Sequence, residues 1–337
     1  MSNTKAAPLI KGINYDVGTE FRAGELSRDV WNLEDVSRDM AVIRGDLGCN
    51  SVNVYGTELS RLEQAARVAL DRGLAVSFQA RSIDADQETA RSLLRAAAGA
   101  ANSLLDYGDV TLNIGCEATL FTRGFLPGRT FQRRMRSLVV AWPFMSRVNR
   151  RLSSYLTRMA ADARGIFGGK ITYGAGSWEE IDWAPFDLVG MNLYRDRWNE
   201  KTYLADLRSL HAHDKPVVIT EFGCATFEGA ERRGGGGWTI VDFTTRPPRV
   251  RRGHQRSERA QAVHLGEMLD LFRDEGVAGT YVFDFLAAAF PHRSEPELDL
   301  DMAGYGVVRV IPSPSTDSIV WERKEAFETV ARRYEQW

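Results

Sequence analysis

The chain of 337 residues contains little cysteine and no long hydrophobic run. Its three cysteines, Cys49, Cys116 and Cys224, are too few and too scattered to build a disulfide framework. No segment reaches the length of apolar sequence that spans a bilayer. The first residues also lack the apolar core of a signal peptide. These absences predict a cytoplasmic protein with no membrane partner.

Motifs for metals and cofactors are missing as well. The histidines do not follow a His-Glu-x-x-His pattern, and no Gly-x-Gly-x-x-Gly opens a helix, as a dinucleotide-binding fold requires. A net charge of −2 gives the whole chain no electrostatic footprint for nucleic acid. We therefore expect no metal, no cofactor and no nucleic-acid partner, whereas the oligomeric state stays open.

What the chain does contain is a regular alternation of apolar runs and helical patterns. Most of the runs are rich in Val, Ile, Phe and Tyr and are bounded by Gly, Pro or Asp, which is typical of buried parallel strands. They cover residues 11–16, 51–55, 75–79, 110–117, 170–175, 188–194, 216–222 and 280–285. Apolar residues at helical spacing recur between most of them, in 33–47, 62–73, 86–105, 151–165, 199–212, 257–275 and 321–335. This alternation predicts a single (β/α)8 TIM barrel over residues 1–337.

Three connections are longer than a bare barrel needs. They follow the fourth, seventh and eighth strands and cover about 118–150, 223–256 and 286–320. Loops that follow strands lie on the face where such barrels place their active sites. The second loop contains four consecutive glycines before Trp238, which predict a mobile or tightly folded lid.

Two glutamates end strands on this face. Glu117 ends the fourth predicted strand and Glu221 lies at the end of the seventh, so the two face each other across the barrel mouth. Enzymes that break a glycosidic bond usually use a pair of carboxyl groups, one protonated and one ionised. Repulsion between them raises one pKa and keeps that group protonated near neutral pH. The alternative for each glutamate is a salt-bridged carboxylate at the barrel rim.

Four short motifs carry a resemblance to a known family. They are Gly115-Cys116-Glu117, Asn192-Leu193-Tyr194, Ile-Thr-Glu-Phe-Gly at 219–223, and Tyr-Gly-Val-Val at 305–308 followed by Trp321. With them the chain resembles the clan of barrel glycoside hydrolases that have catalytic glutamates on strands 4 and 7. The resemblance implies that Glu117 is the general acid/base, that Glu221 is the nucleophile of a retaining mechanism, and that Tyr194 hydrogen-bonds the nucleophile.

The chain departs from this clan at two positions. Cys116 stands where the clan usually has an asparagine that contacts the sugar, and Phe283-Asp284-Phe285 replaces an expected tryptophan. Longer motifs, including Arg-Gly-Gly-Gly-Gly-Trp, are similar to actinobacterial proteins labelled abortive infection proteins, which implies phage defence and specifies no reaction. Three functions therefore stay open. They are a glycoside-hydrolase-like enzyme for a small intracellular glycoside, a biosynthetic tailoring enzyme that moves protons with the same carboxyls, and a non-catalytic binding or defence protein.

Polar and aromatic residues near strand ends are candidates for binding the substrate. They are Asn14, Asp16, Tyr55, Gln79, Arg81, Cys116, Trp178, Asn192, Trp238, Asp284 and His292. The alternative for the polar ones is that they satisfy neighbouring loops, and for the tryptophans that they pack in loops. Cys116 is either a reactive thiolate or, because no His lies near it in the sequence, an inert buried thiol.

Arginine is concentrated in two segments of the long loops, 133–151 and 232–256. One interpretation is a funnel for an anionic substrate, because Arg binds phosphate and carboxylate groups in a bidentate manner. The other is a solvated surface whose arginines pair with Asp and Glu.

Overall fold

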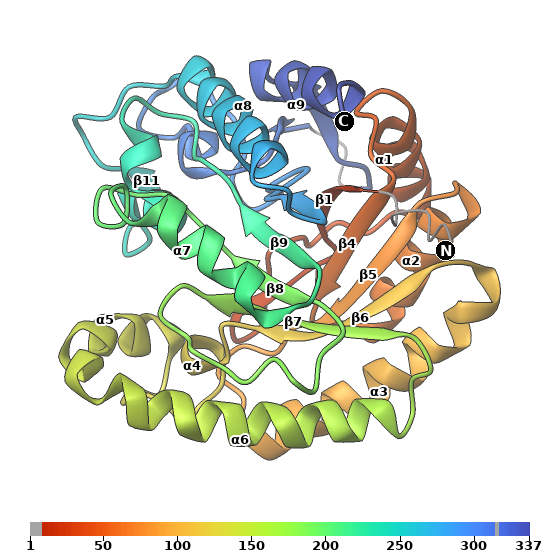
Figure 1. The fold of residues 1–337 in the computed structure, drawn as a ribbon. Helices are drawn as coiled ribbons and strands as arrows, with labels where there is room; N and C mark the ends of the chain where they lie inside the picture. Colours follow the sequence, from red (N-terminus) through yellow and green to blue (C-terminus); the bar gives the residue numbers. More distant parts are fainter. Residues whose placement is uncertain (1–8, 314–316) are drawn as a thin grey trace.

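The structure, a computed structural model that describes residues 9–313 and 317–337, is a closed barrel of eight parallel strands (Figure 1). The strands are β1 (Ile10–Asp16), β4 (Ser51–Gly56), β5 (Ala75–Ala80), β6 (Val110–Cys116), β7 (Lys170–Gly176), β8 (Val189–Asn192), β9 (Val217–Phe222) and β12 (Gly279–Val282). They follow one another around the ring in chain order, and β1 pairs with both β4 and β12 to close it. The eight predicted strands and the (β/α)8 class are confirmed, but the eighth strand ends at Val282 and not at the predicted Phe285.

Helices cover the outside of the barrel at the predicted places. They are α1 (Leu33–Gly45), α2 (Leu59–Asp71), α3 (Gln87–Leu104), α6 (Met145–Arg164), α7 (Tyr203–Ser209), α8 (Glu258–Asp274) and α9 (Glu325–Glu335). Asn32 caps α1 as predicted, because its side chain accepts a hydrogen bond from the Glu34 amide. The last predicted helix begins late, since Val320–Arg323 forms β14 and pairs with β13 (Val308–Ile311) instead.

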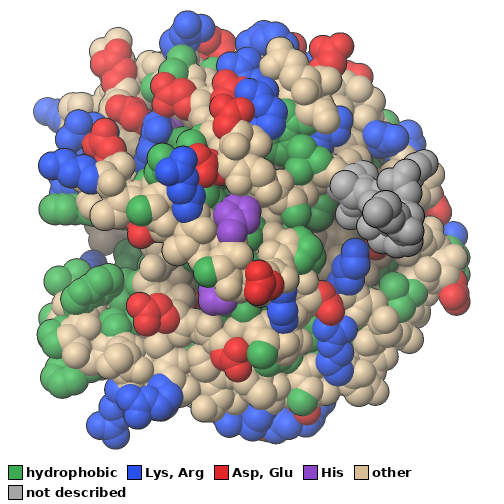
Figure 2. Space-filling view, in the orientation of Figure 1, with side chains coloured by type: hydrophobic (Ala, Val, Ile, Leu, Met, Phe, Trp, Pro, Cys, Tyr) green, Lys and Arg blue, Asp and Glu red, His purple; other side chains and the backbone are tan. Residues whose placement is uncertain are grey.

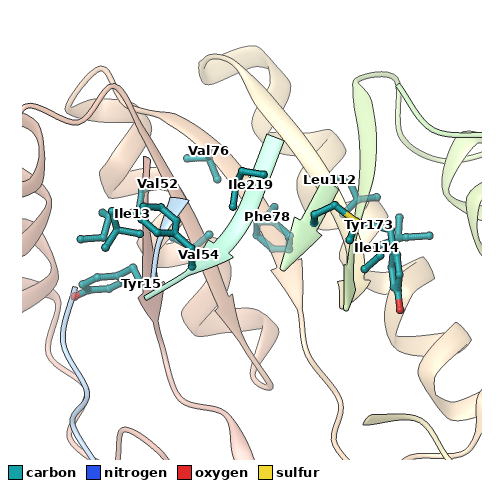
Figure 3. Packing of buried hydrophobic residues seen from close by; sticks show 14 of the residues in the cluster. Ile13, Tyr15, Val52, Val54, Val76, Phe78, Leu112, Ile114, Tyr173 and Ile219 are labelled. Atoms are coloured by element: carbon teal, nitrogen blue, oxygen red, sulfur yellow. The ribbon is translucent and has the colours of Figure 1, made fainter. Parts of the chain in front are cut away.

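Alternation along the strands separates an apolar outer layer from a polar barrel interior. On β4, Val52 and Val54 point into the hydrophobic cluster shared with the helices, together with Val76 and Phe78 of β5 (Figure 3). The intervening Asn53 points inward, where its Nδ2 donates to Asn14 Oδ1 at 2.6 Å. The outer layer supplies hydrophobic stabilisation, and the inner one leaves hydrogen-bonding groups beneath the barrel mouth.

The predicted long loops lie on one side of the barrel. After β6 come α4 (Ala118–Phe121), α5 (Phe131–Ala141) and η2 (Trp142–Phe144). After β9 come η4 (Ala230–Arg232), η5 (Gly234–Ile240), β10 (Val241–Asp242) and β11 (Arg249–Val250). Figure 1 shows α4, α5 and β11 at the same end of the barrel. The remaining short elements are β2 (Glu20–Arg22), β3 (Glu25–Leu26), η1 (Leu105–Tyr107), η3 (Leu210–His213) and η6 (Leu300–Ala303).

The glycine run that predicted a lid is tightly folded. It forms η5, where the Tyr305 hydroxyl donates to the Gly234 carbonyl at 2.6 Å and accepts from the Gly237 amide at 2.7 Å. A Cβ at Gly237 would lie 2.7 Å from Ala225 Cβ, which explains why only glycine fits there.

Candidate active site

Glu117 is the first residue after β6 and lies half-buried at the barrel mouth. Its backbone takes the left-handed conformation, with φ 43° and ψ 44°, before α4 begins. A residue with a side chain reaches this region at a cost in free energy, and such positions concentrate at functional sites. Its Oε1 accepts a hydrogen bond from Asn192 Nδ2 at 3.1 Å. The turn therefore directs the carboxyl group toward the end of β8.

Glu221 lies near the end of β9 and is 7% exposed. Its Oε1 accepts a hydrogen bond from Arg81 Nη2 at 2.6 Å, which makes a buried ion pair. Its Oε2 accepts from the Tyr194 hydroxyl at 3.3 Å. Each oxygen thus has its own donor, and the carboxylate is held in one orientation.

Arg81, directly after β5, is the centre of a buried polar cluster. Its Nη2 also donates to Gln79 Oε1 at 2.9 Å, and its guanidinium carbon lies 4.1 Å from the centre of the Tyr55 ring. The Tyr55 hydroxyl in turn donates to Asp284 Oδ2 at 3.4 Å. Three predicted substrate-binding residues, Tyr55, Gln79 and Asp284, are therefore linked to Glu221 through one arginine.

The two carboxyl groups have different electrostatic surroundings. Burial, and then the nearby charge of Glu221, raise the pKa of Glu117 to about 8, against the opposing effect of the Asn192 hydrogen bond. Glu117 therefore keeps its proton at neutral pH. Glu221, by contrast, has a permanently charged guanidinium in contact with it. The site combines a protonated carboxyl group with an ion-paired one.

Two other predicted substrate-binding residues form hydrogen bonds within the barrel and its first loop. Asn14 is fully buried, and its Nδ2 donates to the Thr220 carbonyl at 3.0 Å. Asp16 accepts from the Gly18 amide at 2.9 Å and from the Thr19 hydroxyl at 3.0 Å, so it fixes the loop after β1. Both lie close to the cluster, but their polar atoms already have protein partners.

The remaining predicted residues are dispersed. Trp178 donates from Nε1 to the Thr119 hydroxyl at 2.8 Å and packs over Gly176. Trp238 lies between the rings of Phe131 and Phe243, at centroid distances of 6.2 and 6.3 Å. His292 contacts Asp299 at 2.9 Å in the loop after β12. None of these recorded contacts joins the three residues to the two glutamates.

Burial decides the state of Cys116. It raises the pKa of this thiol well above the ordinary value, with Arg81 opposing the effect. The thiol is therefore protonated at neutral pH, which favours the inert alternative over a reactive thiolate.

Glu179 is a buried residue that the sequence reading missed. It accepts hydrogen bonds from the Thr119 amide at 2.9 Å, the Thr119 hydroxyl at 2.6 Å and the Tyr173 hydroxyl at 2.8 Å. Tyr173 also accepts from the Ala118 amide at 2.6 Å. These bonds fix the start of α4 and so the position of Glu117. The signal in the sequence is a carboxylate in the short loop after the fifth strand.

The two arginine-rich segments differ in their pairing. In the second, Arg249 and Arg252 contact Glu297, and Arg256 contacts Glu258, Asp299 and Asp301. These arginines fit the interpretation of a paired surface. In the first, Arg134 is buried against Asp84. Among the residues described, no group of three or more His, Cys, Asp or Glu is placed to hold a metal ion.

No family model matches the chain, and no curated protein matches it. Solved structures do match. A GH113 β-1,4-mannanase has a TM-score of 0.63 and 14% identity, covering 98% of this chain and 100% of its own. The GH113 β-mannanase AaManA from Alicyclobacillus acidocaldarius has a TM-score of 0.60 and 14% identity, with 98% of both chains covered.

The endo-β-1,4-mannanase from Thermotoga petrophila follows with a TM-score of 0.56 and 12% identity, covering 99% of this chain and 77% of its own. The fold resembles that of barrel glycoside hydrolases. At these identities the similarity is one of fold. The similarity to abortive infection proteins stays an expectation from the sequence motifs.

Proposed function

We propose that the protein is a retaining glycoside-hydrolase-like enzyme that acts on a small glycoside. The observation that carries the proposal is the contrast between its two mouth carboxyls. Glu117 is protonated because its pKa is raised to about 8, while Glu221 is held by Arg81 and Tyr194. A retaining glycosidase needs this division between an acid and a nucleophile.

In the proposed mechanism, Glu221 attacks the anomeric carbon as the glycosidic bond breaks. Glu117 gives its proton to the leaving oxygen, and a covalent glycosyl ester forms on Glu221. Glu117, now ionised, takes a proton from water, whose oxygen attacks the same carbon and releases Glu221. The enzyme returns to its starting protonation, so no cofactor is consumed.

Buried polar atoms near the carboxyls support binding of a hydroxyl-rich ligand. Within the described residues, Arg81 Nε and Asp284 Oδ1 have no hydrogen-bond partner. Such atoms are costly unless a ligand or water satisfies them. We assign Asp284, Tyr55 and Asn192 to contacts with sugar hydroxyls. Because the matching solved structures include β-1,4-mannanases, aryl β-mannosides come first in a substrate panel.

An anionic substrate stays a prediction. Arg249, Arg252 and Arg256 of the second arginine segment already contact carboxylates, and Arg81 is paired with Glu221. Substrates with and without a carboxylate or phosphate group therefore belong in the same panel.

A second candidate is a tailoring enzyme that uses the same carboxyls for proton transfer in a cyclisation, elimination or rearrangement. The thiol of Cys116 and the carboxyl group of Asp284 favour it, because they stand at positions where the clan recognises a sugar. Under this alternative, deleting the gene removes one metabolite, and the glutamates stay essential although aryl glycosides are not cleaved. If both glutamine variants keep the biological effect, the protein is instead a non-catalytic binding or defence protein.

The raised pKa of Glu117 predicts the pH dependence of the reaction. The acid form acts, so turnover is expected to be high below pH 8 and to fall as the pH rises through about 8. Glu117→Gln should remove this alkaline limb. It should also slow substrates with poor leaving groups by roughly 10²–10⁴-fold, and those with good leaving groups much less.

The measurement is kcat/KM from pH 5 to 10 for two aryl glycosides with different leaving groups. Glu228→Gln, a change at an exposed glutamate, is the matched control. An alkaline limb that persists in Glu117→Gln would contradict the assignment of the acid.

Tyr194→Phe tests the positioning of the nucleophile. The change removes the hydroxyl that donates to Glu221 at 3.3 Å and leaves the ring in place. A hydrogen bond to a charged group contributes about 1.5–3 kcal/mol, so kcat should fall roughly 10- to 100-fold with little change in KM. Tyr203→Phe removes a buried hydroxyl that bonds the Leu193 carbonyl and serves as the control. Equal kcat values for the two variants would rule out a special role for Tyr194.

A further inference from the structure

The corner formed by α5, η2 and the start of α6 exposes large apolar side chains. Val139, Val140, Trp142 and Phe144 are 79, 77, 63 and 66% exposed. Figure 2 shows hydrophobic side chains gathered at the lower left, where Figure 1 places α5. Four adjacent side chains of this size in water are unusual for a monomeric surface and indicate a contact site.

The same corner is strongly cationic. Residues 118–161 contain nine arginines and neither Asp nor Glu, in a chain whose net charge is −2. In the described part of the chain, Arg123 pairs with Asp86 and Arg134 with Asp84, while the other seven arginines form no ion pair. Six of these seven are exposed and flank the apolar side chains in the sequence: Arg129, Arg133, Arg136, Arg147, Arg150 and Arg151.

The helix places both kinds of side chain on one surface. Arg133, Arg136 and Val140 are spaced three and four residues apart, so they share the outer face of α5. Arg134 points the other way, and its Nη1 donates to the Gly128 carbonyl at 3.0 Å. Trp142 and Phe144 then form the exposed tip between α5 and α6.

We propose that this corner, Arg129 to Arg151, docks onto a lipid bilayer that contains anionic lipids. Val140, Trp142 and Phe144 would enter the boundary between headgroups and acyl chains, and the arginines would contact lipid phosphates. Helices that bind at a membrane surface combine Trp, Phe and other apolar side chains with Lys or Arg in this way. Clusters of four to eight basic residues are typical of binding to anionic lipids.

Charge and composition disfavour two other occupants. A symmetric contact between two copies would bring the same unpaired arginines face to face, without carboxylates from this segment between them. The phosphate backbone of a nucleic acid would pair with the arginines. It would offer no apolar surface for Val139 and Val140. A bilayer surface satisfies both kinds of side chain.

The proposal differs from the sequence-based expectation of no membrane partner. That expectation rested on the lack of a spanning segment, and none of the described helices is long and apolar enough to cross a bilayer. A peripheral contact needs no spanning helix. Because α5 follows β6, docking would bring the barrel mouth near the bilayer. The contact itself does not depend on the proposed reaction.

Co-sedimentation with vesicles tests the proposal on the full-length protein. Vesicles of phosphatidylcholine with phosphatidylglycerol should bind it, and vesicles of pure phosphatidylcholine should bind roughly tenfold less. Arg133→Gln with Arg136→Gln should weaken binding to the anionic vesicles, as should Trp142→Ser with Phe144→Ser, each by roughly tenfold. Circular dichroism of each variant checks that it folds.

Matched controls lie outside the corner. Arg252→Gln changes an arginine whose side chain is 93% exposed, and Trp198→Ser changes a tryptophan that is 79% exposed. Neither should alter vesicle binding. The proposal is overturned if anionic vesicles do not bind the protein, or if the corner variants bind like the controls. It is also overturned if the corner variants abolish a dimer seen by sedimentation velocity without vesicles, or if the corner variants lose binding to duplex DNA while they keep their binding to vesicles.

Discussion

Replacing Glu221 with glutamine is expected to reduce kcat for an activated aryl glycoside by roughly 10⁴-fold or more. Glutamine keeps the size of the side chain but cannot attack the anomeric carbon, so the glycosyl ester does not form. The loss should be nearly the same for good and poor leaving groups, because the nucleophile is needed in both cases. This differs from Glu117→Gln, whose effect depends on the leaving group.

The measurement is steady-state and burst kinetics at neutral pH, with Glu228→Gln as the control. A second test adds azide to the Glu221→Gln and Glu117→Gln proteins. In a retaining mechanism an external anion can replace a missing carboxylate, and the configuration of the glycosyl azide identifies which one is missing. A wild-type protein that folds but cleaves no member of the glycoside panel would refute the hydrolase proposal and leave the tailoring alternative.

Arg81→Met is expected to destabilise the protein by about 3 kcal/mol, the cost of breaking a buried ion pair. Methionine fills similar space without charge, so Glu221 is left buried with only the Tyr194 hydroxyl as a donor. The side chains of Arg81 and Glu221 are 5 and 9% exposed, and water therefore compensates little of this loss. Urea denaturation of the wild type and the variant measures the change.

A double-mutant cycle separates the ion pair from the other contacts of Arg81. Adding Glu221→Gln to Arg81→Met should recover part of the lost stability, because no uncompensated charge then remains. Arg252→Met, at a largely exposed position, should stay within about 0.5 kcal/mol of the wild type. Additive effects of the two substitutions would show that the pair is not coupled.

These two predictions concern one cluster in which positioning and stability are linked. Arg81 joins Glu221 to Gln79 and, through the Tyr55 ring, to Asp284. Burial and the charge of Glu221 also raise the pKa of Glu117. A change at the arginine is therefore expected to affect both the fold and the acid, even though the arginine ends a different strand from either glutamate.

Much of the barrel could be predicted because its signals are local. Each strand needed only a short apolar run with its flanking Gly, Pro or Asp, and α1 needed only Asn32 and its apolar spacing. The segment 321–335 shows the limit. Its start was wrong because Val320–Arg323 pairs with Val308–Ile311, a contact that helical propensity alone does not reveal.

The candidate site was predictable in outline for a similar reason. Counting strands was enough to place Glu117 and Glu221 at one end of the barrel, since parallel strands end on the same face. It was not enough to separate residues that join the cluster, such as Gln79, from those that fix loops, such as Asp16. Both types are polar residues at strand ends, and only their partners distinguish them.

The sequence thus carried the order of strands and helices, and with it the face on which both glutamates stand. The partners of those glutamates emerged only in the folded chain. Arg81 lies 140 residues from Glu221, and Asn192 lies 75 residues from Glu117. Contacts at such separations depend on how the closed barrel brings distant strand ends together. The same closure buries Glu117 and brings the charge of Glu221 near it, which raises the pKa of Glu117. The exposed corner of α5 was likewise visible only in the folded chain, because residue types alone did not show which arginines form no ion pair with a carboxylate.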